Sequence, residues 1–451
     1  MAKTLIKKAS IISMDPVIGD IDSGDILIED DLITAVGPEI DAPGAAVFDA
    51  RNMIAIPGLI NAHLHTWETA LRGIGGNWAG NEYFRVVHAH LAPAYTPEDT
   101  YTGNLAGALS QLHAGTTTIF DWCHNNATPA HSDAAIDALF DSGIRALFGH
   151  GTLKPDPKEG EPHYSQVPHP ADEIKRLRTG CLSTDDALVT LAMAILGPDY
   201  STLDVTLHDF RLARDWGLLS SAHIWGTPDR LVKEGYFLLD KEGLLGPDHN
   251  VVHGNYLEDE ELRVIVEAGA SVTATPPVEL QKHPLETMTG RVLAAGGRPS
   301  IGADIEIYVG ADMFHVMRFS LQAQRIFDNM GYAASDRKEE KRILPARAAL
   351  EWATTGNAYA MGLADRIGSI TPGKQADLVL IRADDINMVP LSDPVQAIVL
   401  HAGRENVDTV FVAGRKVKEG GSLAYSSGDL DRLKERLADS ARRLLKECTL
   451  P

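Results

Sequence analysis

Short alternating runs of hydrophobic and polar residues occupy both ends of the chain. The runs LIKKASIISM and DILIEDDLITAVG are rich in Ile and Val and are separated by Pro, Gly or Asp residues, which is typical of short strands joined by turns. The same pattern returns late in the chain in GSITPGKQADLVLIRA. We therefore expect antiparallel strands from residues 1–57 and 367–425 to pair into one small β-sandwich domain that is discontinuous in sequence.

The middle of the chain has a different pattern, in which continuous apolar runs alternate with amphipathic segments. Runs such as TTTIFDW and NVVHGN are typical of buried parallel strands. Segments such as DEELRVIVEAG have the spacing of helices that cover such strands. This alternation predicts an α/β fold, a (β/α)8 TIM-type barrel over residues 58–366. The last residues, 426–451, carry charges at i,i+4 spacing and predict an amphipathic C-terminal helix.

Composition and charge narrow the class of protein. A length of 451 residues suits one enzyme-sized domain with a smaller one. The formal net charge of −21 argues against a nucleic-acid or anionic-membrane partner, because either needs a basic patch. The N-terminal residues contain no apolar run long enough for a signal peptide or a membrane span. Cys123, Cys181 and Cys448 form no CxxC pair and no even-numbered framework, which argues against a disulfide scaffold and favours the cytoplasm.

Several predicted strands end in residues that can bind a metal. His63 and His65 follow the apolar run MIAIPGLIN and are separated by one residue, so on a strand both side chains point to the same face. Two such imidazoles can chelate a metal, although solvated histidines explain an isolated HxH pattern equally well. Three more predicted strands end in His223, His253 and Asp304. Because the carboxyl ends of barrel strands open at one mouth, we expect these side chains to converge there.

The ordered motifs resemble those of a known family. PGLINAHLH, VVHGNYLEDEEL, SIGADIE and GSITPGKQADLVLI occur in this order, with a lone strand-end His before the second. Together they resemble the amidohydrolase superfamily, and most closely its cytosine-deaminase and triazine-hydrolase branch. The resemblance extends from the first β segment to about Gly414. It implies a metal-dependent hydrolase of carbon–nitrogen bonds other than peptide bonds.

The resemblance also implies roles for individual residues. It assigns His63, His65, His223 and Asp304 as metal ligands and leaves a fifth position for water, whose proton Asp304 would accept. It makes His253 the residue that orients the metal-activated hydroxide or the substrate's reacting group. Three imidazoles and one carboxylate suit one divalent metal, Zn²⁺ first and Fe²⁺ as the alternative.

The predicted fourth barrel strand bears on the number of metals. The binuclear branch of the superfamily uses a lysine on this strand to bridge two ions. Residues 187–193, ALVTLAM, contain no lysine. A single metal is therefore expected.

The chain departs from the deaminases of this branch at Gly226. In those enzymes the fifth-strand His is followed three residues later by a Glu that protonates a ring nitrogen of the substrate, and Gly226 occupies that position here. Three other carboxylates are candidates to bind the substrate in place of this Glu, namely Asp121, Glu279 and Glu306. The alternative role is helix capping for Asp121, a solvated loop position for Glu279 and pairing with an Arg for Glu306.

Aromatic residues are expected at the mouth of the barrel. Four tryptophans follow predicted strands or lie in predicted loops on that side: Trp67, Trp78, Trp122 and Trp225. They suit stacking on a flat substrate, with Trp67 and Trp225 as the main candidates, although ordinary packing explains any one of them. The segment 71–93 carries glycine hinges with His88 and His90 and could form a lid. We assign these two histidines no metal, since i and i+2 diverge on a helix.

Three functions remain open at this point. The first is hydrolysis of a C–N bond in an amino- or N-alkylamino-heterocycle, urea, lactam or amide. The second is deamination of a purine, pyrimidine or triazine-type ring with a non-standard acid in place of the Glu missing at Gly226. The third is a dehalogenating or catalytically altered family member. In each case we expect a cytoplasmic protein with a small-molecule partner, and the C-terminal helix is compatible with a homodimer.

Overall fold

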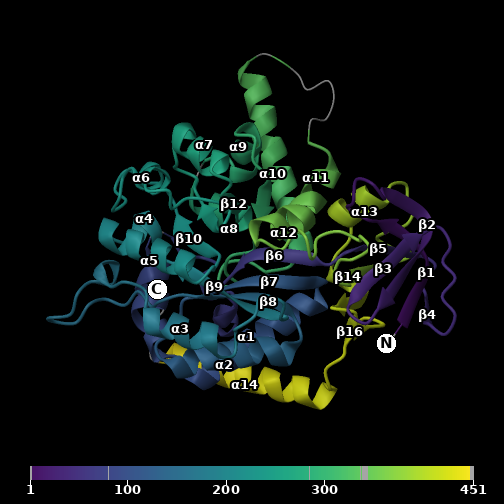
Figure 1. The fold of residues 1–451 in the computed structure, drawn as a ribbon, viewed down its shortest axis with the longest axis horizontal. Coiled ribbons are helices and arrows are strands. Elements are labelled where there is room, and N and C mark those ends of the chain that lie inside the picture. Colours follow the sequence, from purple (N-terminus) through teal and green to yellow (C-terminus); the bar gives the residue numbers. More distant parts are fainter. Residues whose placement is uncertain (1–2, 80, 284, 336, 338–343, 447–451) are drawn as a thin grey trace.

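A computed structural model describes residues 3–79, 81–283, 285–335, 337 and 344–446 (Figure 1). Cys448 lies outside these residues. The strands form two separate sheets, one of eight strands and one of nine. The eight-stranded sheet lies in the middle of the chain and the nine-stranded sheet combines strands from both ends of it.

The eight-stranded sheet forms the barrel. Its strands are β6 (Leu59–Leu64), β7 (Thr116–Cys123), β8 (Arg145–His150), β9 (Val189–Ile195), β10 (Ser220–Ile224), β11 (His249–His253), β12 (Ser271–Ala274) and β13 (Pro299–Ile301). They are paired in chain order, and every neighbouring pair is parallel. Their side chains are almost all buried, as the continuous apolar runs predict.

The two edges of this sheet meet at the functional site itself. A parallel bridge joins Leu64 to Asp304. The backbone N–H of Asp304 donates to the His63 carbonyl at 3.0 Å, and the N–H of His65 donates to the Asp304 carbonyl at 2.9 Å. The predicted (β/α)8 barrel is therefore confirmed, and its first and last strands are held together by residues that carry the candidate chemistry.

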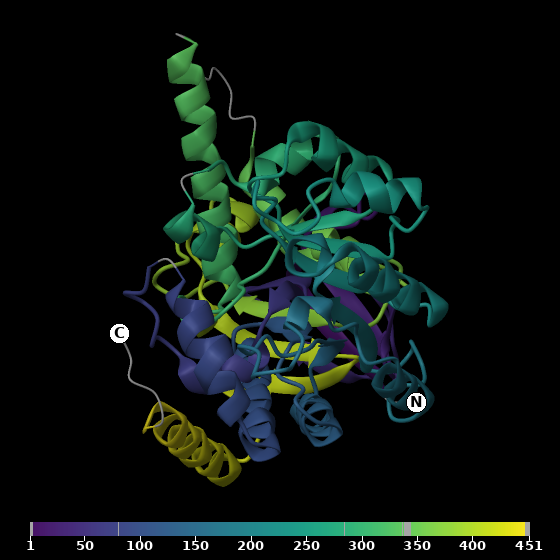
Figure 2. The same ribbon diagram turned by 90° about the vertical axis from the view of Figure 1, so that its left-hand side faces the viewer.

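Helices cover the outside of the barrel (Figures 1 and 2). The α-helices are α1 (Pro97–His113), α2 (Pro129–Ser142), α3 (Ala171–Thr179), α4 (Gly197–Tyr200), α5 (Leu203–Asp215), α6 (Gly235–Lys241), α7 (Asp259–Glu267), α8 (Pro276–Lys282), α9 (Met288–Ala294), α10 (Met313–Ala334), α11 (Ala346–Glu351), α12 (Asn357–Ala360), α13 (Pro394–Leu400) and α14 (Ser427–Lys446). The 3₁₀ and π segments are η1 (Thr66–Leu71), η2 (Phe84–Leu91), η3 (Ala92–Ala94), η4 (Tyr164–Gln166), η5 (Trp352–Gly356) and η6 (Arg404–Asn406). Among the described helices, none is long and apolar enough to cross a membrane.

The second sheet combines the two ends of the chain. Its strands are β1 (Lys3–Ile12), β2 (Asp20–Glu29), β3 (Leu32–Gly37), β4 (Ala46–Asp49), β5 (Met53–Pro57), β14 (Leu378–Arg382), β15 (Val407–Val412), β16 (Arg415–Glu419) and β17 (Ser422–Leu423). β14 pairs antiparallel with β5, which joins the N-terminal strands to the C-terminal ones.

The pairing within this sheet is mixed rather than purely antiparallel. β1 pairs parallel with β4 over one half and parallel with β5 over the other. The prediction of antiparallel strands throughout is therefore wrong for these two pairs. The pairing of β1 with β2 has register shifts on both sides of Ala9, an irregularity of the kind that lets a strand change direction.

Buried charges attach this sheet to the barrel. Arg145 at the start of β8 donates to Asp377 next to β14, with Nε 2.7 Å from Oδ2. Lys418 of β16 is buried and its Nζ donates to the carbonyl of His113 at the end of α1 at 2.6 Å. Each buried charge has a partner, as burial requires.

The C-terminal helix α14 packs along α1 on the outside of the barrel (Figure 2). Leu433 and Leu444 are buried on its inner face. Ser440 Oγ donates to Asp99 Oδ1 at 2.7 Å, and Arg443 pairs with the same carboxylate. The helix is thus a packing element whose amphipathic pattern is satisfied within the chain.

Candidate metal centre and active site

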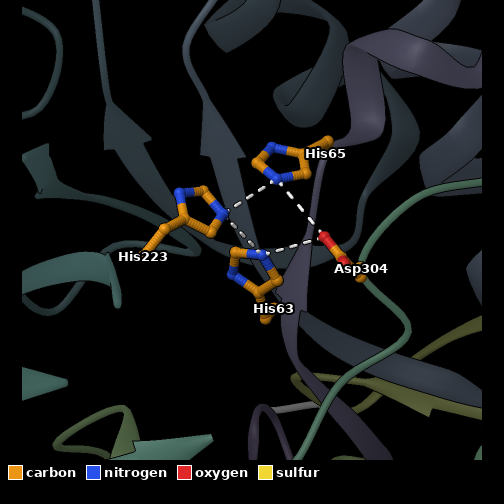
Figure 3. A group of neighbouring side chains, drawn as sticks. All are labelled: His63, His65, His223 and Asp304. Atoms are coloured by element: carbon orange, nitrogen blue, oxygen red, sulfur yellow. Dashed lines mark hydrogen bonds and ion pairs between the residues drawn. The ribbon is translucent and has the colours of Figure 1, made fainter. Parts of the chain in front are cut away.

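Four side chains gather where the barrel closes (Figure 3). His63 lies on β6 and His65 directly follows that strand, His223 lies on β10, and Asp304 follows β13. The Nε2 atom of His223 lies 3.1 Å from Nε2 of both His63 and His65. Oδ1 of Asp304 lies 3.3 Å from Nε2 of His63 and 3.5 Å from Nε2 of His65. Ligands about 2.1 Å from a tetrahedral zinc ion are about 3.4 Å apart, so the spacing suits one such ion.

The protonation of these imidazoles also suits a metal. Burial lowers the pKa of His63 and holds the pKa values of His65 and His223 well below the ordinary value, so the rings are neutral, as coordination requires. Nδ1 of His65 donates to the Trp122 carbonyl at 2.7 Å, which leaves the lone pair on Nε2 directed into the site. Lone pairs and a carboxylate directed at one point need a cation between them. The residues present therefore fit one divalent metal ion.

Two of the strand-end residues have left-handed backbone conformations. His253 has a φ of 74° and Asp304 a φ of 66°. Few residues other than glycine adopt this region, and such strain collects at functional sites. These turns occur at the carboxyl ends of β11 and β13, where the barrel opens.

His253 lies beside the four ligands, and a buried carboxylate holds its ring. Its ring centroid is 5.5 Å from that of His223. Nδ1 of His253 lies 3.2 Å from Oε1 of Glu279, and the ring stacks on Trp225 at 4.1 Å with the planes only 4° apart. Because Nδ1 donates to the carboxylate, Nε2 remains free to face the cavity.

Glu279 is a positioning residue for His253 rather than a solvated loop residue. It lies on α8 and is fully buried. Its carboxylate also accepts hydrogen bonds from the N–H of Thr275 at 2.7 Å and from Nδ2 of Asn255 at 3.3 Å. The sequence pattern predicted Glu279 as a substrate-binding carboxylate, whereas in the structure its carboxylate is directed at His253 and does not line the cavity.

The other two candidate carboxylates have partners outside the cavity. Glu306 accepts a hydrogen bond from Oγ1 of Thr69 at 3.0 Å and pairs with Nε of Arg72 at 3.0 Å. Asp121 is buried and accepts a hydrogen bond from Nδ2 of Asn104 at 2.8 Å. Burial raises the pKa of Asp121 to about 7. The structure does not bring either carboxylate to the cavity.

The four tryptophans divide into two pairs. Trp225 and Trp78 line the cavity. Trp67 is fully buried, and its Nε1 donates to Nδ1 of His124 at 3.3 Å. Trp122 packs 4.1 Å from the ring of His223. Trp67 and Trp122 therefore lie behind the residues of the site, and only the first pair can contact a substrate directly.

A side chain at Gly226 would be strained and would clash with the neighbouring backbone. It has a φ of 78°, and a Cβ built there would lie 2.7 Å from the backbone nitrogen of Leu257. Its N–H donates to Oδ2 of Asp199 at 2.9 Å, which holds the loop in place. The glutamate expected at this position is thus excluded by the local packing as well as absent from the sequence.

A pair of glycine substitutions tests this packing. Gly217 also has a positive φ, of 62°, but a Cβ there would meet nothing within 4 Å. We expect Gly217→Ala to lower the free energy of unfolding by about 1–2 kcal/mol through backbone strain alone. Gly226→Ala adds overpacking and is expected to lower it by about 2–5 kcal/mol in total. Chemical unfolding of both variants measures the difference; equal losses would contradict the steric argument.

Three of the four ligands, His65, His223 and Asp304, line a cavity of about 900 Å³ together with His253. Its walls include several aromatic rings and a few cationic or imidazole groups, namely Trp78, Tyr83, Phe84, Tyr164, Tyr200, Trp225, His88, His124, Lys154 and Lys282. The predicted lid segment contributes η2, from which His88 lines the cavity while His90 is exposed.

Sequence reasoning missed three polar residues near this cavity. Lys154 lies in the loop after β8, so the strand-end rule that selected the histidines could have found it. Lys282 ends α8, and no sequence signal marks it. Glu68 lies three residues after His65 and is fully buried, with Tyr83 Oη donating to its Oε1 at 2.6 Å. A carboxylate so close to a metal motif was a usable signal.

Known proteins with a similar chain are deaminases and related hydrolases. The model of the amidohydrolase family matches residues 54–417. The 5'-deoxyadenosine deaminase of Methanosarcina mazei is 27% identical over 427 residues, which cover 92% of each chain. An adenosine deaminase from Xanthomonas campestris with bound zinc superposes with a TM-score of 0.83 at 23% identity over 99% of each chain.

A triazine enzyme is also similar in fold. A variant of the atrazine chlorohydrolase of Arthrobacter aurescens, complexed with zinc and atraton, superposes with a TM-score of 0.82 at 22% identity, over 97% of this chain and 100% of that one. The family match spans all five residues that converge at the mouth of the barrel, and the resemblance predicted from the motifs is confirmed. The chain belongs to the amidohydrolase family, and it is a metal-dependent hydrolase of carbon–nitrogen bonds other than peptide bonds.

Proposed function

We propose that this protein uses one zinc ion, bound by His63, His65, His223 and Asp304, to remove an amino or alkylamino group from a planar heterocycle. The observation that carries the proposal is the convergence of these four ligands, with His253 beside them, on a cavity with aromatic walls. Two comparisons support it. The Methanosarcina relative is a deaminase of 5'-deoxyadenosine, and both solved neighbours described above contain zinc.

The chain's own residues supply the proton transfers. A bound divalent metal lowers the pKa of a water molecule from about 15.7 to about 7 and so makes a nucleophile available at neutral pH. Asp304 accepts the proton of the attacking water. Nε2 of His253 faces the oxygen that adds to the reacting carbon, while Glu279 accepts the hydrogen bond of its Nδ1–H. Asp304 passes the first proton of the water to the ring nitrogen. His253 takes the second proton from the hydroxyl group of the adduct and delivers it to the leaving nitrogen, and the carboxylate of Glu279 stabilises the imidazolium in between.

A second candidate function is hydrolysis of a urea, lactam or amide. One observation favours it, namely that the packing around Gly226 excludes the glutamate that would protonate a ring nitrogen. An amine that leaves from an amide can take its proton from Asp304 or His253 instead. Cytoplasmic localisation and a homodimeric state stay predictions from the sequence.

Removal of the metal and a substrate panel test the proposal. We expect protein purified without added metal to contain one zinc per chain, and a chelator to abolish turnover that zinc then restores. The panel contains amino- and alkylamino-heterocycles on one side and ureas, lactams and amides on the other. Ammonia or alkylamine release from the heterocycles alone would support the proposal. Turnover of the amides alone would favour the second function, and no turnover of either class by the zinc-loaded protein would contradict both.

A further inference from the structure

A buried lysine faces the cavity beside the metal ligands. Lys154 is only 6% exposed, and it lines the cavity. Its Nζ lies 5.2 Å from the centroid of the Trp122 ring and 5.6 Å from that of Tyr200. The ring of Trp122 also packs against the ring of His223, with the centroids 4.1 Å apart. Lys154 and His223 thus contact the same indole ring, and the charge of Lys154 contributes to the lowered pKa values of His65 and His223.

A second lysine faces the same cavity. Lys282 lines the cavity from the end of α8. Its Nζ lies 4.4 Å from the centroid of the Tyr308 ring and 5.4 Å from that of Tyr83. Its charge interacts with those of Asp304 and Glu68. The two ammonium groups therefore face one cavity, which His65, His223 and Asp304 also line.

Neither ammonium has an acceptor for its hydrogen bonds. Within the described residues, Lys154 and Lys282 make no hydrogen bond or ion pair, and their close partners are aromatic rings. Contact with a ring offsets part of the cost of burying an ammonium but accepts none of its three N–H donors. Buried cations in folded proteins are normally paired. An unpaired one that faces a cavity indicates that its partner is a ligand.

The carboxyl groups around the cavity do not neutralise these charges. Burial raises the pKa of Glu68 well above its ordinary value and so disfavours its charged form. Its Oε1 accepts a hydrogen bond from Tyr83 Oη, and within the described residues it forms no ion pair with either lysine. Asp156 and Asp229 lie at the cavity but are exposed to solvent. Asp304 is a candidate metal ligand, and its charge is shared with a divalent ion. The interior of the cavity is therefore cationic, although the whole chain has a formal net charge of −21.

We propose that the substrate carries a negatively charged oxygen group, either a carboxylate or an ionised ring hydroxyl, and that Lys154 and Lys282 bind it beside the reacting carbon. This inference rests on the proposed function, because it describes the substrate of that same site. It narrows the substrate from planar heterocycles in general to anionic ones. The lysines are binding residues in this proposal and take no part in the bond cleavage.

Binding of a matched pair of planar probes tests the proposal apart from catalysis. Benzoate and benzamide have the same shape, but only benzoate is charged. Their affinity for the zinc-loaded protein can be measured by the quenching of tryptophan fluorescence. We expect Lys154→Met to weaken benzoate binding by about tenfold or more, as the loss of a charge-assisted hydrogen bond requires, and to leave benzamide binding unchanged.

Three further variants serve as controls. Lys154→Arg keeps the charge and is expected to retain most of the benzoate affinity. Lys241→Met removes an exposed lysine of α6 and is expected to change nothing. Lys282→Met removes the half-buried lysine, which keeps the test valid if Lys154→Met fails to fold. Equal benzoate affinity in the parent protein and the folded lysine-to-methionine variants would overturn the proposal.

Turnover separates this inference from the proposed function. The panel contains two pairs, cytosine with cytosine-5-carboxylate and melamine with ammelide, whose hydroxyl groups ionise. Faster turnover of cytosine-5-carboxylate than of cytosine would identify the charged group of the substrate as a carboxylate. Faster turnover of ammelide than of melamine would identify it as an ionised ring hydroxyl. If benzoate binding depends on the lysines but no member of the panel is turned over, the proposed function alone is contradicted. If neutral and anionic members are turned over equally and benzoate binding does not depend on the lysines, the proposed anionic substrate alone is contradicted.

Discussion

Asp304→Asn is expected to lower kcat/KM by more than about 100-fold, because loss of even an outer partner of a metal ligand costs about 10- to 100-fold. The substitution removes a charged ligand and the group that accepts the proton of water. Asparagine has the same shape as aspartate and tolerates the left-handed φ of 66° at this position, so the backbone should keep its conformation. Metal content by mass spectrometry and steady-state kinetics on the same preparation measure the two effects.

A neighbouring carboxylate provides the control for Asp304→Asn. Glu306 is close in sequence but binds Thr69 and Arg72 instead of the metal centre. Glu306→Gln is therefore expected to keep its metal and to change kcat/KM by less than about threefold, since a pair with a half-exposed arginine contributes little. If Asp304→Asn kept full metal content and full turnover, the metal site would be wrongly assigned. If Glu306→Gln instead lost turnover, Glu306 would be a substrate-binding residue.

His253→Asn is expected to lower kcat by about 100- to 10,000-fold, the usual contribution of a positioned general acid or base. His253 is not among the four converging ligands, so the bound metal should remain. Asparagine again suits the positive φ, of 74°. The expected result is thus a loss of kcat at unchanged metal content, which distinguishes a catalytic residue from a ligand.

The control for His253→Asn lies at the other end of the same strand. His249 begins β11, is buried, and hydrogen-bonds with Oγ of Ser220 at 2.9 Å and with Oη of Tyr236 at 3.1 Å. Because it lies at the amino end of the strand, away from the mouth, His249→Gln is expected to lower stability and leave kcat of the folded protein unchanged. A normal kcat in His253→Asn, or an equal loss in both variants, would contradict the role given to His253.

Much of the fold followed from local pattern. Continuous apolar runs mark strands that are buried on both faces, and parallel barrel strands are of this kind. The alternation in the terminal segments predicted the second sheet, and the β5–β14 pairing joins its two parts. The parallel pairs of β1 with β4 and β5 could not be predicted, because strand direction within a sheet depends on the path of the chain between strands and not on residue type.

The sequence alone determined which residues reach the mouth of the barrel. Side chains alternate strictly along a strand, and every parallel strand of a barrel ends at the same face. The positions of His63, His65, His223, His253 and Asp304 at strand ends therefore imply their convergence, which the structure shows for the four ligands within 4.8 Å.

Only the tertiary structure decided what the remaining polar residues contact. Glu279 turns to His253, Glu306 and Asp121 find partners outside the cavity, and Lys154 and Lys282 enter it. Asp121 lies on β7 and bonds to Asn104 of α1. The other residues lie on helices or in loops, where no fixed periodicity sets the direction of a side chain relative to the mouth. Their direction depends on packing between segments far apart in the chain, and that is why the convergence of the four candidate ligands could be predicted while the charge of the cavity could not.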